Sequence, residues 1–540
     1  MKVHISTFVV PPSGGIRESG LQKSRLKSVL QTTLVSIFIA FAGIATADVR
    51  LPGMFSDSMV LQRDSKLPVW GWAEPGEEVT VAIAGQKATA TADQDGNWRV
   101  TLAPLQANSE PQELTITGKN SIVIKDVLVG EVWLCSGQSN MAFGVQNGRD
   151  APAEIAAANF PQIRLYHATR YPSLVPLTEH RGTWAVCSSE TVGGWTAVGY
   201  FFARELHKEL GVPVGLLNAS QGSMPIQTFT SLQSLKPIPV AAVRLAEYET
   251  LVQECLAQAG VAASTNAAQR DAALRAAINM IDAKLGSCGD QPGSLYNSSI
   301  FPLAPYALRG AIWYQGEGDA DEPPGYYSRA LPALITEWRR IWGRDELPVG
   351  VVQLPNFGKR QRDAISDGWP EFRDEQFRGA RAVENVGLIV TIDIGEHNNI
   401  HPRNKQDVGK RLALWARANV YGAKDLIWSG PVYQSMKIEG DKVRLAFDHV
   451  GGGLQFKDGE PRGFAVAGED KVFYLAKARI DGDSVIVWSD RVKGPVAVRY
   501  AWANNPVGNL FNQANLPAMP FRTDDWGVTE VKASDDEKIP

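Results

Sequence analysis

Four short loops carry the side chains with which this chain could do chemistry. Each follows an apolar, strand-like run, and they lie at residues 137–140, 221–223, 315–319 and 391–402. The first presents Ser139 directly after such a run, and the last contains His401. A serine hydroxyl, a histidine and small-residue loops that offer backbone N–H groups are the parts of an acyl-transfer site. The sequence therefore predicts a hydrolase with Ser139 as the nucleophile and His401 as the general base.

The fold must bring these loops together. Between residues 130 and 423, the apolar runs VPVGLLNAS, ALRGAIWY and NVGLIVTID alternate with amphipathic helical segments. This alternation predicts an α/β domain with a doubly wound, mostly parallel sheet, in which ligands bind at the carboxyl ends of the strands. Because all four loops follow strands, we expect them to meet at that edge of the sheet.

Further segments surround or interrupt this domain. Residues 48–129 alternate apolar and polar side chains between Pro-Gly and Asp-Gly turns, which predicts a small antiparallel sandwich or barrel. The same pattern returns over residues 424–526 and predicts a C-terminal β module, followed by an acidic tail at 527–540. An Ala-rich helical insert is predicted at about 240–290, and Cys255 and Cys288 could close it with one disulfide.

The first 47 residues have the features of a secretory signal. Basic residues precede an apolar stretch at 34–44, and Ala45-Thr46-Ala47 follows it. This order predicts cleavage after Ala47 and export to the periplasm or the medium. The apolar stretch is shorter than the roughly 20 residues of a membrane span, so no stable membrane insertion is expected. The net charge of −4 gives no reason to expect a nucleic-acid partner, and the oligomeric state stays open.

Three blocks of the sequence stand out: GEVWLCSGQSNM at 130–141, LYNSSIFPLAPYALRGAIWYQGE at 295–317 and IHPRNKQDVGKRLA at 400–413. Together they resemble the sialate O-acetylesterase family of SGNH-type hydrolases. The likeness extends into both β-rich regions. It implies an SGNH-hydrolase-like doubly wound parallel sheet flanked by N-terminal and C-terminal β-sandwich-like modules. It also implies removal of O-acetyl groups from sugars without a metal or other cofactor, with Ser139 as nucleophile, His401 as base and Gly222 as the oxyanion-hole glycine.

The chain departs from the family pattern around the oxyanion hole. Gln221 and Ser223 stand where tryptophan and a second glycine are expected beside Gly222. A further donor in SGNH enzymes is an asparagine, and its place falls here on Asp319. An ionised carboxylate cannot donate a hydrogen bond. Either Asp319 is protonated, or Gln315 or backbone N–H groups replace it.

The sequence offers more than one solution for the acid that would complete a catalytic triad. Related hydrolases often place an aspartate two or three residues before the histidine, where this chain has Asn399 and Asn398. The remaining candidates are Asp393, at the end of its strand, and Glu317. A Ser–His dyad is the alternative, because the acid mainly orients the imidazole.

An acetylated carbohydrate is the expected substrate, and an O-acetylated sialic acid is the first choice. Acetylated xylan or pectin is the alternative, since a fold does not select its sugar. Candidate substrate-binding residues are Gln138, Glu317, Arg360 and Arg362, because arginine can pair with a carboxylate.

Two other classes of function compete with the esterase. A non-catalytic carbohydrate-binding protein would use some of the 15 tryptophans to stack on sugars. A metallohydrolase would use His397 and His401 beside Glu396, but the intervening asparagines and Pro402 favour a loop over the helix that this spacing needs.

Overall fold

The computed structural model describes residues 48–168, 171–361, 368–526 and 531–532. The predicted signal segment, most of the acidic tail and Arg362 lie outside these residues. Every described residue belongs to one compact unit, residues 47–540.

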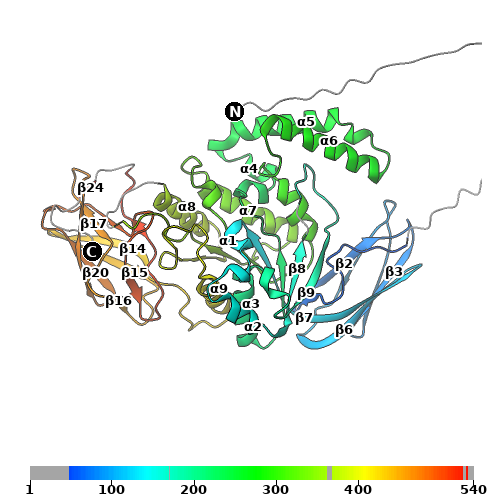
Figure 1. Ribbon diagram of the computed structural model, residues 1–540, viewed down its shortest axis with the longest axis horizontal. Coiled ribbons are helices and arrows are strands. Elements are labelled where there is room, and N and C mark those ends of the chain that lie inside the picture. Colours follow the sequence, from blue (N-terminus) through cyan, green and yellow to red (C-terminus); the bar gives the residue numbers. More distant parts are fainter. Residues whose placement is uncertain (1–47, 169–170, 362–367, 527–530, 533–540) are drawn as a thin grey trace, which may run out of the picture. The chain divides into compact units, whose positions relative to one another are not determined.

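A seven-stranded path forms the centre of the largest sheet (Figure 1). Six neighbouring strands are parallel and the last is antiparallel to its neighbour. In spatial order the strands are β13 (Val386–Ile389), β12 (Val349–Val352), β11 (Gly310–Tyr314), β7 (Ser121–Gly137), β10 (Val214–Asn218), β8 (Phe160–Ala168) and β9 (Gly182–Cys187). The predicted parallel sheet is confirmed.

Apolar cores cover both faces of this sheet, as a doubly wound fold requires. On β11, Ala311 and Trp313 enter the core of α7 (Tyr327–Trp342) and α8 (Trp369–Arg381). Ile312 and Tyr314 point the other way, into the core of α3 (Ala197–Leu210) and α9 (Lys405–Asn419). A strand buried on both faces has no polar side to show, which is why it appears in the sequence as a continuous apolar run.

Side-chain caps define where the helices of the second core begin. The Thr196 hydroxyl accepts the Gly199 N–H at 3.2 Å and starts α3, which ends at Gly211 in a left-handed conformation. The Asn404 side chain accepts the Asp407 N–H at 3.2 Å and starts α9 directly after the His401 loop. Such caps satisfy N–H groups that the helix leaves free.

The N-terminal strands continue into the central sheet through β7. The first half of β7 pairs with β6 and β1, and its second half pairs with β10 and β11. The strands concerned are β1 (Val60–Gln62), β3 (Glu78–Ile83), β4 (Gln86–Thr91) and β6 (Asn108–Thr117). The other two N-terminal strands, β2 (Leu67–Trp72) and β5 (Asn97–Leu102), pair with each other in a separate two-stranded sheet. Their core is continuous with that of α7 and α8. The domain boundaries at 129 and 423 stay a prediction.

The C-terminal strands form further sheets around a core of their own. Four strands make one sheet: β14 (Val432–Glu439), β15 (Lys442–Asp448), β20 (Ser484–Trp488) and β19 (Lys477–Asp481). Five make another: β23 (Phe521–Arg522), β21 (Ala497–Tyr500), β17 (Phe464–Ala467), β18 (Phe473–Leu475) and β24 (Val531–Lys532). Two short strands pair separately: β16 (Leu454–Phe456) and β22 (Leu510–Asn512).

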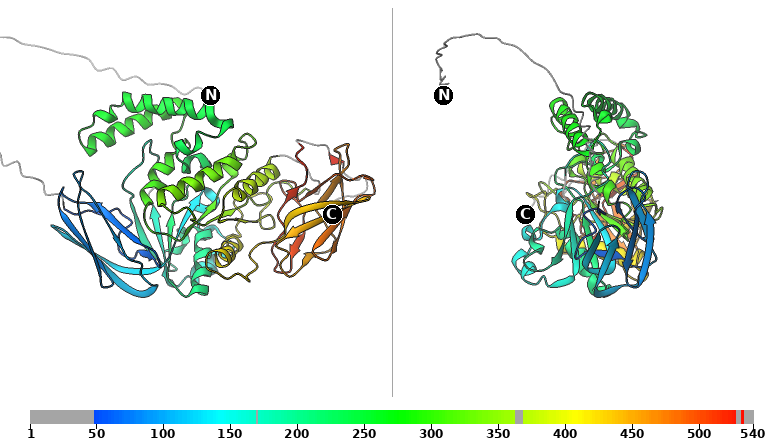
Figure 2. Two further views of the ribbon diagram at one scale, coloured as in Figure 1. Left: turned by 180° about the vertical axis from the view of Figure 1, so that it is seen from behind. Right: turned by 90° about the vertical axis from the view of Figure 1, so that its right-hand side faces the viewer.

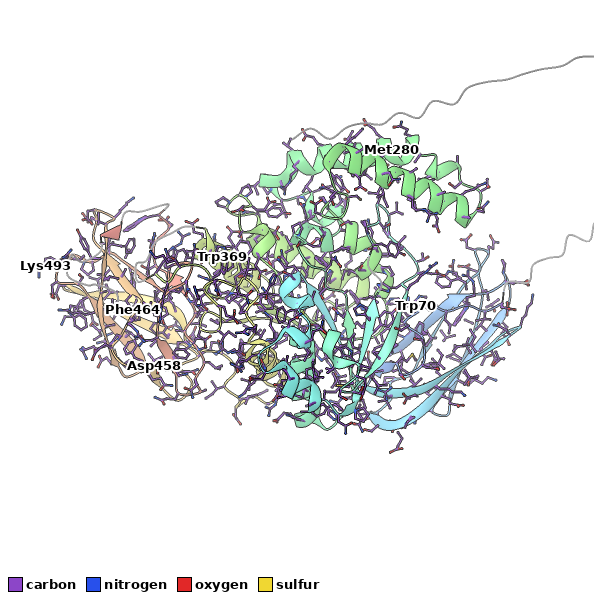
Figure 3. The ribbon with its side chains drawn as sticks, viewed as in Figure 1. Trp70, Met280, Trp369, Asp458, Phe464 and Lys493 are labelled. Atoms are coloured by element: carbon purple, nitrogen blue, oxygen red, sulfur yellow. The ribbon has the colours of Figure 1, made fainter. Side chains whose placement is uncertain are left out.

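Two long helices form a hairpin within the α/β part of the chain: α5 (Ala242–Gln258) and α6 (Ala267–Leu285). Figure 2 shows them side by side, and Met280 of α6 is labelled in Figure 3. The expected disulfide is absent here: Cys255 and Cys288 are free thiols, buried in a small apolar core that includes Tyr248. Burial in this core, rather than a covalent link, holds the two cysteines.

Short helices complete the described secondary structure. They include α1 (Ser139–Ala142), α2 (Ala151–Ala156), α4 (Leu232–Leu235) and the 3-10 helices η3 (Ile226–Phe229) and η8 (Glu317–Asp319). None of the helices in the described ranges has both the length and the apolarity that a membrane span needs.

Candidate active site

Ser139 stands at the point where β7 ends and α1 begins. The turn depends on Gly137, which has a φ of +134° and lies so close to β11 that a Cβ on it would be 2.2 Å from the Tyr314 carbonyl oxygen. The next residue, Gln138, donates its backbone N–H to the same oxygen at 3.0 Å. The tight approach of the two strands therefore fixes where the serine hydroxyl is presented, at the carboxyl edge of the sheet.

His401 reaches Ser139 from the loop between β13 and α9. Its Nε2 lies 2.7 Å from the serine Oγ, a hydrogen-bonding distance. The Asn399 side chain accepts the His401 backbone N–H at 3.0 Å, and the Phe143 ring stacks on the imidazole with 6.4 Å between ring centroids. Burial, and then the Lys405 cation, lower the pKa of His401 below its usual 6.5. A neutral imidazole can accept the serine proton.

Gly222 lies in the loop that follows β10, beside the serine. The Gln221 N–H bonds to the Gly137 carbonyl oxygen at 2.9 Å and ties this loop to the nucleophile turn. A Cβ built on Gly222 would be 3.8 Å from the Ser139 Cβ, with no other heavy atom within 4 Å. The structure thus brings Ser139, His401 and Gly222 together, as the sequence predicts. Ser223 beside them adopts a left-handed φ of 62°.

Gln315 and Asp319 bond to each other and to their own surroundings. Gln315 Nε2 donates to Asp319 Oδ2 and, at 3.0 Å, to Gln138 Oε1, so both of its amide hydrogens are engaged. Asp319 Oδ2 also accepts the Ile226 N–H at 2.8 Å. Its Oδ1 is buried without a partner among the described residues, and burial raises the pKa of Asp319 to about 7. Of the two, only a protonated Asp319 retains a hydrogen to donate.

Gln138, a candidate substrate-binding residue, has its side-chain oxygen bonded to the protein's own 315–319 loop. Its Oε1 accepts the N–H groups of Gly316 at 3.3 Å and Gly318 at 3.0 Å, in addition to the Gln315 amide. With three donors on one oxygen, the Gln138 side chain is held against the loop after β11. This residue therefore joins the nucleophile turn to the 315–319 loop.

The two candidate triad acids point elsewhere. Asp393 forms a two-pronged ion pair with Arg411 of α9, with both N–O distances at 2.7 Å. Glu317 accepts a hydrogen bond from the Asn140 side chain, and burial raises its pKa. Among the described residues, neither carboxylate forms a hydrogen bond with His401. Of the proposed triad, the structure therefore shows only the contact between Ser139 and His401 among the described residues.

Two side chains that adjoin this pair were not predicted from the sequence. Asn140 and Lys405 are both fully buried, and the Lys405 ammonium donates to Asn140 Oδ1 at 2.5 Å. Lys405 also lies over the rings of Phe143 and Tyr314, at 4.8 and 5.3 Å from their centroids. Both residues fall in the blocks that carry the family resemblance, but a lysine in the first turn of a helix is usually exposed, so its type gave no signal.

The remaining candidates are two arginines and the acid of the alternative metal site. Arg360 is exposed, and Arg362 lies outside the described residues. Glu396 accepts from the Asn399 side chain at 3.1 Å and from the Arg403 N–H at 2.7 Å, so it braces the His401 loop. No cluster of three or more histidine, cysteine or acidic side chains suited to a metal occurs within the described ranges.

Comparison with known proteins gives three consistent findings. The family model described as carbohydrate esterase, sialic acid-specific acetylesterase, matches residues 291–416. A solved carbohydrate acetylesterase from Xanthomonas citri is 37% identical, with a TM-score of 0.76, over 88% of this chain and 100% of that one. Proteins named sialate O-acetylesterase from Mus musculus and Homo sapiens are each 28% identical over 523 residues, which is 87% of this chain and 94% and 92% of theirs.

Proposed function

The chain belongs to the sialic acid-specific acetylesterase family of carbohydrate esterases, and we propose that it removes acetyl groups from O-acetylated sialic acids, with Ser139 as nucleophile and His401 as base. The observation that carries these two roles is the 2.7 Å contact between His401 Nε2 and Ser139 Oγ at the carboxyl edge of the sheet. A nucleophile within hydrogen-bonding reach of its base is the geometry that acyl transfer needs.

The first half of the reaction forms an acyl-enzyme. His401 Nε2 takes the Ser139 proton as Oγ attacks the acetyl carbonyl carbon, and the carbonyl oxygen becomes an oxyanion. The backbone N–H groups of Ser139 and Gly222 are the proposed donors to that oxyanion. The bond between the acetyl carbon and the sugar oxygen then breaks, and His401 gives its proton to the departing oxygen.

The second half releases acetate. Water attacks the acetyl carbon on Ser139 while His401 takes one of its protons, and the same donors hold the second oxyanion. Collapse breaks the bond to Oγ, which regains the proton from His401. Each cycle consumes one water and yields one sugar hydroxyl and one acetic acid, which ionises to acetate and a proton. Because neither Asp393 nor Glu317 bonds to the imidazole, we infer that the site works as a Ser–His dyad.

The test is the replacement of Ser139 by alanine. Hydrolysis of p-nitrophenyl acetate should fall by about 10³-fold or more, because loss of the nucleophile leaves only binding and the oxyanion donors. The melting temperature should not change. Ser189→Ala is the matched control, because Ser189 is exposed and lies outside the four loops of the site, and this variant should keep full activity. An unchanged kcat in Ser139→Ala would disprove the assignment.

A second candidate substrate class is acetylated plant polysaccharide. The solved relative at 37% identity is described only as a carbohydrate acetylesterase, which leaves sugars other than sialic acid open, whereas the proteins named for sialate are 28% identical. Acetate release from O-acetylated sialosides, acetylated xylan and acetylated pectin separates the two. Release from the sialosides alone supports the first proposal, and release from a polysaccharide alone replaces it with the second.

We also propose that the chain is exported and that its N-terminal segment is removed. The basic residues at 25 and 27, the apolar stretch at 34–44 and the Ala-Thr-Ala sequence ending at 47 support this. Mass spectrometry of the protein from the producing cells should give a first residue of Asp48. A retained N-terminus would contradict export by this route.

A further inference from the structure

A row of buried polar side chains adjoins Ser139 and His401 but has no part in the mechanism above. Lys405 donates to Asn140 Oδ1, and Asn140 Nδ2 donates to Glu317 Oε1. The three residues come from different elements: α9, α1 and η8. We refer to them as the Lys405–Asn140–Glu317 row.

The row is costly in free energy. Lys405 is the first residue of α9, where the helix dipole opposes a positive charge, and it is fully buried. Burial lowers the pKa of Lys405 to about 7 and raises that of Glu317. Replacing a buried charge pair by apolar groups is often neutral or stabilising, so stability alone is a weak reason for such a pair. The position of the pair beside Ser139 and His401 suggests a different reason, which is the placement of the reacting groups.

Asn140 connects the two segments that present the reacting groups. It follows Ser139 directly in α1, and its Nδ2 also donates to the backbone carbonyl of Ile400 at 2.9 Å. Ile400 directly precedes His401. One amide group therefore fastens the nucleophile turn to the base loop, and its own orientation is fixed because Lys405 binds its oxygen while Glu317 binds its nitrogen.

From these contacts we propose that Asn140 is a positioning residue that holds His401 at Ser139, and that the Lys405–Glu317 pair locks Asn140 in place. This inference rests on the proposed function. The row fixes the backbone of the base loop, whereas a triad acid would fix the imidazole ring itself.

The row also places a cation near the base. Phe143 stacks on His401, and the Lys405 ammonium lies over the same Phe143 ring. The other charged groups near the imidazole are Glu317 from η8 and, in the base loop, Glu396 and its partner Arg403. A cation at this place opposes protonation of the imidazole, so Lys405 should keep His401 in its basic form at lower pH.

Two single variants and one control test the proposal, with p-nitrophenyl acetate as substrate. Asn140→Ala should lower kcat by about 100-fold with little change in KM, because the base is no longer held at the nucleophile. Lys405→Met should move the acid limb of the pH profile of kcat/KM upward by about half a pH unit. Lys410→Met, the same change at an exposed position of α9, should change neither kcat nor the acid limb of the pH profile.

A double variant guards against a purely structural explanation. Lys405→Met combined with Glu317→Gln removes both charges, so neither is left buried alone, and its melting temperature should stay close to that of the unmodified protein. Its acid limb should still be shifted. A double variant with the original acid limb, or an Asn140→Ala protein that melts earlier but keeps its kcat, would overturn the proposal. Absence of esterase activity in the unmodified protein would instead refute the proposed function.

Discussion

Replacing Gly137 by alanine should disable the enzyme by forcing the nucleophile strand away from its neighbour. A Cβ at this position would lie 2.2 Å from the Tyr314 carbonyl oxygen, 2.7 Å from its carbonyl carbon and 3.0 Å from its nitrogen. All three are backbone atoms of β11, so no side-chain rotation relieves the overlap. The φ of +134° at Gly137 is a second obstacle, because side chains with a Cβ rarely adopt it.

The size of the effect follows from these two obstacles. The backbone conformation costs about 1–3 kcal/mol for a residue with a Cβ. Relief of the overlap requires β7 and β11 to separate by roughly 1 Å, which breaks the 3.0 Å bond from Gln138 N–H to the Tyr314 oxygen at a cost of about 1 kcal/mol. The variant should therefore be less stable by about 2–4 kcal/mol. A displacement of about 1 Å at a reacting group costs about 100-fold in rate.

The assay compares Gly137→Ala with a control that has only the conformational obstacle. Gly260 has a φ of +72°, and a Cβ added to it would meet no heavy atom within 4 Å. Gly260→Ala should cost about 1 kcal/mol in urea unfolding and keep full activity on p-nitrophenyl acetate. Gly137→Ala should lose about 100-fold in kcat/KM. A Gly137→Ala enzyme within twofold of normal activity would refute the view that strand contact positions the serine.

Three further predictions concern ionisation and buried contacts. Because burial and the nearby lysine lower the pKa of His401, the acid limb of the pH profile of kcat/KM should lie below pH 6.5, and a limb above 6.5 would contradict this. Burial raises the pKa of Asp319 to about 7, so this group should reduce stability as the pH rises from about 4 to 7. In urea unfolding, Asp319→Asn should abolish this pH dependence of the free energy of unfolding. An unchanged pH dependence would argue against the role of Asp319. Arg373→Met should destabilise the protein by about 3–5 kcal/mol in urea, because it leaves backbone carbonyls without their buried donor, and a loss below 1 kcal/mol would argue against this. Those carbonyls belong to Leu354, Pro355 and Ala503, whereas the Asn504 carbonyl, a fourth acceptor of the Arg373 side chain, also accepts the Phe357 N–H at 3.1 Å.

The fold was predictable because its signal is local. Every residue of β11 is buried, with Trp313 in one core and Tyr314 in the other. A strand that packs into a core on both faces must be apolar along its whole length, and the sequence shows such a run. The loops after such strands must lie at one edge of a parallel sheet. That rule is enough to bring Ser139 and His401, 262 positions apart, into one neighbourhood.

The partners of these residues were not predictable, because a side chain's neighbours depend on contacts distant in the sequence. Asp393 was expected at the end of a core strand and looked available, but it lies beyond the end of β13, where Arg411 of α9, 18 residues later in the chain, bonds to both of its oxygens. Cys255 and Cys288 have a spacing that allows a disulfide, yet they are packed as free thiols. Neither outcome is encoded in residue type or spacing alone.

The asparagine that stands two residues before His401 shows why a triad aspartate is missing there. Asn399 Oδ1 accepts the His401 N–H, while its Nδ2 donates to Glu396 Oε2 at 3.1 Å. An aspartate at 399 could make the first bond but not the second, and would place two carboxylates at hydrogen-bonding distance, where both cannot stay ionised. Glu396 in turn accepts the Arg403 N–H and so closes the loop. Asn399 and Glu396 are thus a matched pair that shapes the backbone around the base. A loop held in this way, and tied to the nucleophile turn through Asn140, can present the imidazole without a carboxylate on its far nitrogen.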